Sequence, residues 1–83
     1  MSDYWNENLK KTIKPGNKVK LFFNEGNRNN QIMEIREIVD EDYIVYRVYD
    51  MSEDRYDYHI QYIYLFYLYD REDCLTLLSK ETD

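Results

Sequence analysis

Short segments in which apolar and polar side chains alternate constrain the fold of this chain more than any other feature of its sequence. They span residues 18 to 23, 31 to 39, 43 to 50 and 55 to 60. A period of two places successive side chains on opposite faces of a strand, so each segment predicts a half-buried β-strand. The segment from 43 to 50 is the clearest of them, and both of its faces carry apolar bulk.

Polar turns separate these segments. Residues 24 to 30 are rich in asparagine and include Gly26, so we expect a hairpin loop there. Acidic turns are expected at residues 40 to 42 and 51 to 54. The adjacent apolar residues at 38 and 39 indicate a bulge or the end of a strand.

A helix is expected before the first strand, over about residues 3 to 12. Apolar side chains recur there at four-residue spacing, which puts them on one helical face: Trp5, Leu9 and Ile13. Ser2 or Asp3 would cap the first turn of this helix, and Pro15-Gly16 would end it.

Two further elements are expected after residue 60. The run from 61 to 69 is apolar or aromatic after Gln61, which predicts a short turn and a fifth strand buried on both faces, with a helix as the alternative. Asp70 would then cap a C-terminal helix over about residues 71 to 80, whose buried side would hold Cys74 and three leucines.

These elements together predict a single, mostly β domain over residues 1 to 83. Five short strands with tight turns, flanked by short terminal helices, would form a small, strongly bent antiparallel sheet or a barrel. Hydrophobic residues make up 43% of the 83 residues, which is enough for one compact core.

Three features indicate a soluble protein of the cytoplasm. No apolar run approaches the roughly 20 residues that a membrane-spanning helix needs. The first residues carry acids and lack the apolar stretch of a secretory signal. Cys74 is the only cysteine, so it cannot form an internal disulfide, which favours a reducing compartment.

The order of the motifs along residues 14 to 69 adds a resemblance. The chain reads Lys14-Pro15-Gly16-Asn17-Lys18-Val19-Lys20-Leu21, a loop, Ile32-Met33-Glu34-Ile35, an acidic turn, the strand from Tyr43 to Tyr49 and a later aromatic strand. This order resembles small bacterial Src-homology-3-like barrels, including the KOW and Tudor types. The resemblance implies a five-stranded barrel and a binding module without catalysis, whose ligand is a protein or a nucleic acid.

Catalysis, a metal and a cofactor are not expected. His59, the only histidine, would lie in a strand beside Tyr58, where a solvated or tyrosine-paired imidazole is a better interpretation than a general base. Cys74 lies among leucines and is interpreted as a buried, inert thiol. The acidic turns lack the alternating ligands, central glycine and distant glutamate of a calcium loop.

The net charge of −6 is unevenly distributed. Residues 1 to 33 hold six basic and three acidic residues, residues 34 to 58 hold three and nine, and residues 59 to 83 hold two and five. Two thirds of the chain would therefore repel phosphate, which disfavours direct binding of nucleic acid.

Ten tyrosines among 83 residues are the most unusual part of the composition. We expect about half of them to fill the core and the others to be exposed. Exposed tyrosines beside acids suit a basic protein partner, because aromatic rings attract cations over their faces and carboxylates complement their charge. The residues predicted to contact this partner are Glu34, Glu37, Asp40, Glu41, Asp42, Tyr43, Tyr49, Asp50, Glu53, Asp54, Tyr56 and Asp57.

Three functions remain open at this point. The preferred one is a non-enzymatic adaptor or subunit that binds a protein through its acidic, tyrosine-rich surface. An alternative is a phage or mobile-element inhibitor of the anti-CRISPR or anti-restriction type, which mimics nucleic acid and blocks a basic groove with salt-sensitive affinity. A weaker alternative is a single-stranded nucleic-acid binder, which would use Trp5 or Phe22 for stacking and a basic patch of Lys10, Lys11, Lys14, Lys18 and Lys20.

Overall fold

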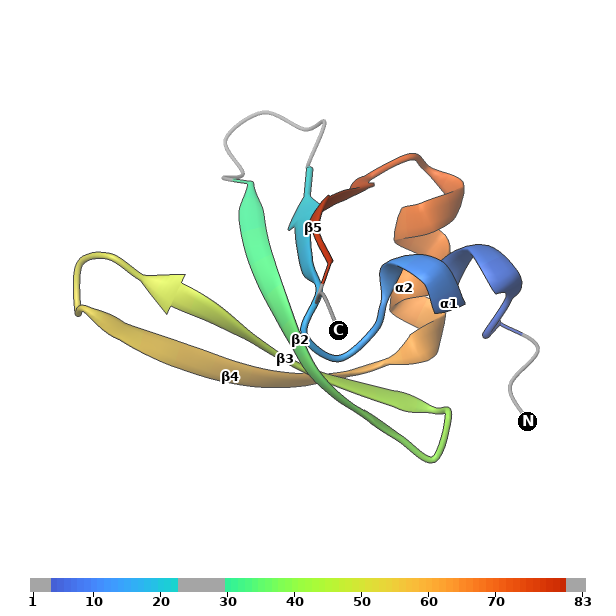
Figure 1. Cartoon of the computed structure of the whole chain (residues 1–83), viewed down its shortest axis with the longest axis horizontal. Coiled ribbons are helices and arrows are strands. Elements are labelled where there is room, and N and C mark those ends of the chain that lie inside the picture. Colours follow the sequence, from blue (N-terminus) through green and yellow to red (C-terminus); the bar gives the residue numbers. More distant parts are fainter. Residues whose placement is uncertain (1–3, 23–29, 81–83) are drawn as a thin grey trace.

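The chain forms one five-stranded antiparallel sheet with two short helices (Figure 1). The computed structural model describes residues 4–22 and 30–80. The elements in chain order are α1 (Glu7–Thr12), β1 (Lys18–Leu21), β2 (Gln31–Val39), β3 (Tyr43–Asp50), β4 (Arg55–Tyr62), α2 (Ile63–Arg71) and β5 (Leu75–Ser79). The strand order is β4-β3-β2-β1-β5, so β4 and β5 are the two edges of an open sheet.

A bulge in β2 divides the sheet into two parts. The pairing of β2 with β3 shifts register between Ile35 and Glu37, where β2 carries an additional residue. Such a bulge bends its strand and increases the local twist. Figure 1 shows that the end of the β3–β4 ladder with the turn at residues 51 to 54 extends away from the two helices, whereas the other end of β4 leads directly into α2.

The core lies between the helices and the sheet. Phe66 and Ile63 from α2 and Leu9 from α1 are buried together with apolar side chains from every strand except β4 and β5. The remaining buried apolar residues are Ile13, Val19, Leu21, Met33, Ile35, Ile44, Tyr46 and Cys74. Side chains at helical spacing on α1 and α2 and side chains at alternating positions of the strands therefore fill one common core.

Several predicted elements are confirmed. The strands predicted at residues 31 to 39 and 43 to 50 have the predicted bounds, and the acidic turns at 40 to 42 and 51 to 54 join the strands. The sheet is open and bent, and the domain is mostly β. Most of the hairpin loop predicted at residues 24 to 30 lies outside the described residues.

The first helix is shorter than predicted. It begins at Glu7, and its N-cap is Asn6, whose side-chain oxygen accepts a 2.9 Å hydrogen bond from the backbone N–H of Leu9. The predicted caps, Ser2 and Asp3, lie outside the described residues. Asparagine is among the strongest N-cap residues, so the helix begins where a cap is followed by the apolar face.

The preferred predictions after residue 60 were wrong, whereas the helix given as the alternative for residues 61 to 69 is observed. Residues 63 to 71 form α2 instead of a fifth strand, and Leu75–Ser79 forms β5 instead of the C-terminal helix predicted at 71 to 80. Ile63 and Phe66 are three residues apart and both buried, which is a helical spacing. β5 pairs with β1, whose second edge would otherwise leave backbone donors and acceptors without partners.

None of the helices in residues 4–22 and 30–80 combines the length and the apolar character that crossing a membrane requires.

Candidate protein-binding face

The apolar side chains of strand β4 are exposed to solvent. Tyr58, Ile60 and Tyr62 are each 59% exposed, and Tyr56 is also exposed. The intervening His59 stacks on the buried Tyr46, with ring centroids 5.2 Å apart, although His59 is itself exposed. No residue of β4 is buried, so this strand differs from an ordinary half-buried strand, which covers its apolar residues.

Cross-strand pairs extend this apolar surface onto β3. Residues directly opposite each other in an antiparallel ladder share a face. The register pairs Tyr49 with Tyr56, Arg47 with Tyr58, Val45 with Ile60 and Tyr43 with Tyr62. We call these eight residues the tyrosine face.

Arg47 holds the centre of the tyrosine face in place. Its Nη1 donates a 3.2 Å hydrogen bond to the Tyr58 hydroxyl, and its Nη2 forms a 3.0 Å ion pair with Glu34 Oε1 on β2. Its guanidinium carbon lies 3.8 Å from the centre of the Tyr56 ring. The hydrogen bond to Tyr58 and the ion pair with Glu34 raise the pKa of Arg47 further above its ordinary value. One side chain therefore connects three strands on this face.

The predicted acidic residues do not form one surface. Asp40, Glu41 and Asp42 lie in the turn between β2 and β3, whereas Asp50, Glu53, Asp54 and Asp57 lie at the opposite end of the β3–β4 ladder. The eight residues of β3 separate the two groups by roughly 25 Å. Glu37 is exposed beside the bulge, between them. The structure thus places an apolar face between two acidic ends.

The acids at the far end of the ladder stabilise their own turn. Asp50 Oδ1 accepts hydrogen bonds from the Ser52 hydroxyl at 2.7 Å and from the backbone N–H groups of Ser52 and Glu53 at 3.0 and 3.3 Å. The bond from the Ser52 hydroxyl and those from the backbone lower the pKa of Asp50. The Tyr49 hydroxyl donates to Asp54, which raises the pKa of Tyr49. Asp57 pairs with Arg55 at 3.4 Å.

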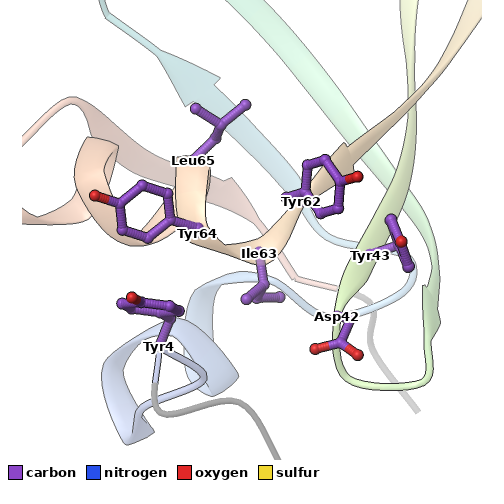
Figure 2. Close-up of a pocket in the computed structure, with 7 residues that line it drawn as sticks. All are labelled: Tyr4, Asp42, Tyr43, Tyr62, Ile63, Tyr64 and Leu65. Atoms are coloured by element: carbon purple, nitrogen blue, oxygen red, sulfur yellow. The ribbon is translucent and has the colours of Figure 1, made fainter.

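The near end of the ladder opens into a pocket of about 460 Å³, which we call the tyrosine pocket. Figure 2 shows Tyr4 and Tyr64 on one side of it and Tyr43 and Tyr62 on the other, with the Asp42 side chain at its edge. The ring centroids are 4.6 Å apart in the first pair and 5.0 Å apart in the second. Ile63 and Leu65 complete the lining.

A backbone hydrogen bond holds the two sides of the tyrosine pocket together. The N–H of Ile63, at the start of α2, donates to the carbonyl oxygen of Asp42 at 2.8 Å. The pKa of Tyr43 is raised by a hydrogen bond with Tyr62 and by the proximity of its ring hydroxyl to that residue and to the Asp42 and Asp40 carboxylates. The pocket therefore lies in a field of negative charge.

The tyrosines are more exposed than predicted. Of the ten, only Tyr46 is buried, and Tyr43, Tyr67 and Tyr69 are partly buried. The expectation that about half of them fill the core was wrong, because aliphatic residues and Phe66 already occupy that volume. Sequence analysis identified Tyr43, Tyr49 and Tyr56 in the face but missed Tyr58, Ile60 and Tyr62, although their alternation with polar residues was visible.

The basic residues of the first third of the chain lie on α1, on β1 and around a second pocket. Lys10 pairs with Glu7 at 3.6 Å, and Lys18 and Lys20 lie on β1. Lys11 and Lys14 line a second pocket of about 360 Å³ with Lys80. Three lysines thus gather around one pocket, and binding of single-stranded nucleic acid stays a prediction.

The groups with chemical reactivity lie apart. Cys74 is buried just before β5, and burial raises its pKa, which disfavours the thiolate. His59 contacts Tyr46, as described above. Within residues 4–22 and 30–80, histidine, cysteine, aspartate and glutamate form no group of three or more that could hold a metal ion.

Comparisons with family models, with curated proteins and with solved structures found no match for this chain.

Proposed function

We propose that the chain is a non-enzymatic protein-binding domain whose contact surface is the tyrosine face. The observation that supports this proposal is the exposure of three consecutive outward residues of β4, Tyr58, Ile60 and Tyr62. Monomeric proteins seldom leave a contiguous apolar surface of this kind in water unless it binds something.

The composition of the tyrosine face supports the same proposal. Tyrosine and arginine are enriched among the residues that contribute most to the affinity of protein complexes. Arg47 is fixed in the centre by Glu34, Tyr56 and Tyr58, so little side-chain entropy remains to be lost on binding. The acidic ends of the ladder would steer a basic partner onto the face.

We also propose that the sheet is of the Src-homology-3-like type. The bulged β2, the meander from β1 to β4 and the return of β5 to pair with β1 support this classification. Nucleic-acid mimicry remains an alternative prediction, and the separation of the acids into two groups weighs against it, since a mimic needs charge along its whole contact surface.

Capture of partners from a bacterial lysate tests the proposed function. The bait is the full chain, and the test variant combines Tyr58→Ser with Ile60→Ser. The matched control combines Phe22→Ser with Leu78→Ser, which removes two exposed apolar residues from another part of the surface. We expect the control to retain the partner and the test variant to lose it.

Two further conditions separate the alternatives. A partner that remains bound to the Tyr58→Ser, Ile60→Ser variant would contradict the proposal. A partner lost at high salt and displaced by added DNA or RNA would support nucleic-acid mimicry instead. Urea denaturation of each variant verifies that the domain is folded.

A further inference from the structure

We infer that the tyrosine pocket receives an arginine side chain of the protein partner. The inference rests on the proposed function, because the pocket shares Tyr43 and Tyr62 with the tyrosine face. A partner lying along β3 and β4 would therefore reach the pocket at the near end of the ladder.

The shape of the tyrosine pocket suits a flat cation. Its two sides are the ring pairs Tyr4–Tyr64 and Tyr43–Tyr62, which come from the N-terminal segment, β3, β4 and α2 (Figure 2). The faces of tyrosine rings attract cations, and the attraction grows when water is excluded. The lining is mainly apolar, so the stem of a long side chain would also be buried favourably.

The charges around the tyrosine pocket favour a cation over an anion. Asp42 lines the pocket, Asp40 and Glu41 lie in the same turn, and the lining includes no basic residue. Among the described residues, the Asp42 carboxylate has no ion-pair partner. The start of α2 contributes only about half a positive charge, and the Asp42 carbonyl already accepts one of its N–H groups. The negative charge of the three carboxylates therefore exceeds the partial positive charge at the start of α2.

Arginine fits this pocket better than lysine. A guanidinium group is planar, so it can stack on a tyrosine ring while its edge donates two parallel hydrogen bonds to a carboxylate. A related arrangement already occurs at Arg47, whose guanidinium lies over the Tyr56 ring while Nη2 donates a single 3.0 Å hydrogen bond to Glu34 and Nη1 donates to the Tyr58 hydroxyl. An ammonium group is compact and strongly hydrated, and it makes no planar contact.

Titration with the capped tripeptide Gly-Arg-Gly, followed by the amide NMR shifts of the full chain, tests the inference. We expect saturable shifts confined to Asp42, Tyr43 and the start of α2. The same peptide with citrulline, a neutral isostere of arginine, should produce no saturable shift. Asp42→Asn and Tyr64→Leu should each weaken binding of the arginine peptide by about fivefold or more.

The matched control is Glu53→Gln, which removes one carboxylate from the opposite end of the ladder and should change the affinity by less than about twofold. Equal shifts with the citrulline peptide, or shifts spread over both acidic ends, would overturn the inference. If the arginine peptide does not bind but the Tyr58→Ser, Ile60→Ser variant loses its partner, the proposed function stands and this inference fails. If the peptide binds the pocket but the same variant keeps its partner, the pocket stands and the proposed face fails.

Discussion

The two parts of the sheet are stabilised in different ways, although both follow from the same alternating sequence pattern. In the part formed by β1, β5 and the first half of β2, inward residues such as Val19 and Met33 are fully buried under the helices. β5 has no fully buried residue, but its Leu75 and Leu77 pack against the core. In the far half of the β3–β4 ladder, β4 contributes neither a buried residue nor an apolar side chain packed against the core. There the strands are held by the turn at Asp50, by cross-strand ring contacts and by Arg47.

This difference shows that the alternation of apolar and polar residues predicts a strand, but it does not predict which face of the strand other elements cover. Tertiary burial supplies most of the stability where the helices cover the sheet. Where the helices do not cover the sheet, local hydrogen bonds and cross-strand pairs supply the stability. The uncovered part is free to keep an apolar face for binding.

The largest expected effect comes from removing a core side chain in the covered part. Phe66 is 1% exposed and contacts Tyr46 edge to face, so Phe66→Ala should lower the free energy of unfolding by about 3 to 5 kcal/mol. Ile60→Ala, on the exposed side of β4, should cost less than about 1 kcal/mol. Urea denaturation measures both. Similar losses from the two variants would show that the ladder is as tightly packed as the core.

A smaller loss is expected when Arg47 is replaced in the tyrosine face. Arg47→Leu keeps an apolar stem but removes the contacts to Glu34, Tyr56 and Tyr58. The urea midpoint should fall, by less than for Phe66→Ala, and part of the difference should disappear at about 1 M salt. The matched control is Arg55→Leu, because Arg55 is exposed and forms an ion pair with Asp57 at the end of the ladder. An equal fall in both variants would contradict the central role of Arg47.

Acid should loosen the far end of the ladder before the covered part. Hydrogen bonds from Ser52 and Glu53 lower the pKa of Asp50 in the folded protein, so its contribution to stability is present above the ordinary pKa near 4 and is lost as the pH falls through the lower, folded value. Amide shifts of Ser52 and Glu53 between about pH 6 and pH 2 report this change.

The control for the acid effect is Asp50→Asn, which keeps an accepting oxygen but cannot titrate in this range. In this variant the shifts of the two turn amides should lose their pH dependence. If the wild-type turn amides change only together with those of Ile35 in the core, the turn does not loosen separately and the expected order is wrong.

The sequence predicted locally determined elements better than elements that depend on tertiary contacts. β2, β3 and the two acidic turns were predictable because local alternation and turn chemistry determine them. The identity of α2 and β5 was not predictable, since the run from 62 to 69 is apolar or aromatic at every position and β5 depends on its pairing with the distant strand β1. The acidic residues of the candidate site were predictable because they lie in local turns. The tyrosine pocket was not predictable, because it depends on α2 lying against the turn at Asp42.

The smallest expected effect is a gain in stability at the turn between β2 and β3. Asp40 and Glu41 have φ angles of 53° and 58°, and the N–H of Asp42 donates to the Val39 carbonyl at 3.0 Å. Two consecutive residues with positive φ define the type I′ turn, which favours glycine at the second position. Glu41→Gly should therefore raise the free energy of unfolding by about 1 kcal/mol, as measured by urea denaturation.

Two controls separate backbone strain from charge in this last prediction. Glu41→Gln removes the same charge but keeps the side chain, so it should bring a smaller gain than Glu41→Gly. Asp54 has a similar φ of 51° at the far end of the ladder, but its carboxylate accepts from the Tyr49 hydroxyl. Asp54→Gly relieves the strain and loses that bond, so it should bring no net gain. A gain at Asp54 equal to that at Glu41 would mean that the Tyr49 contact does not stabilise the uncovered ladder, which would weaken the contrast between the two parts of the sheet.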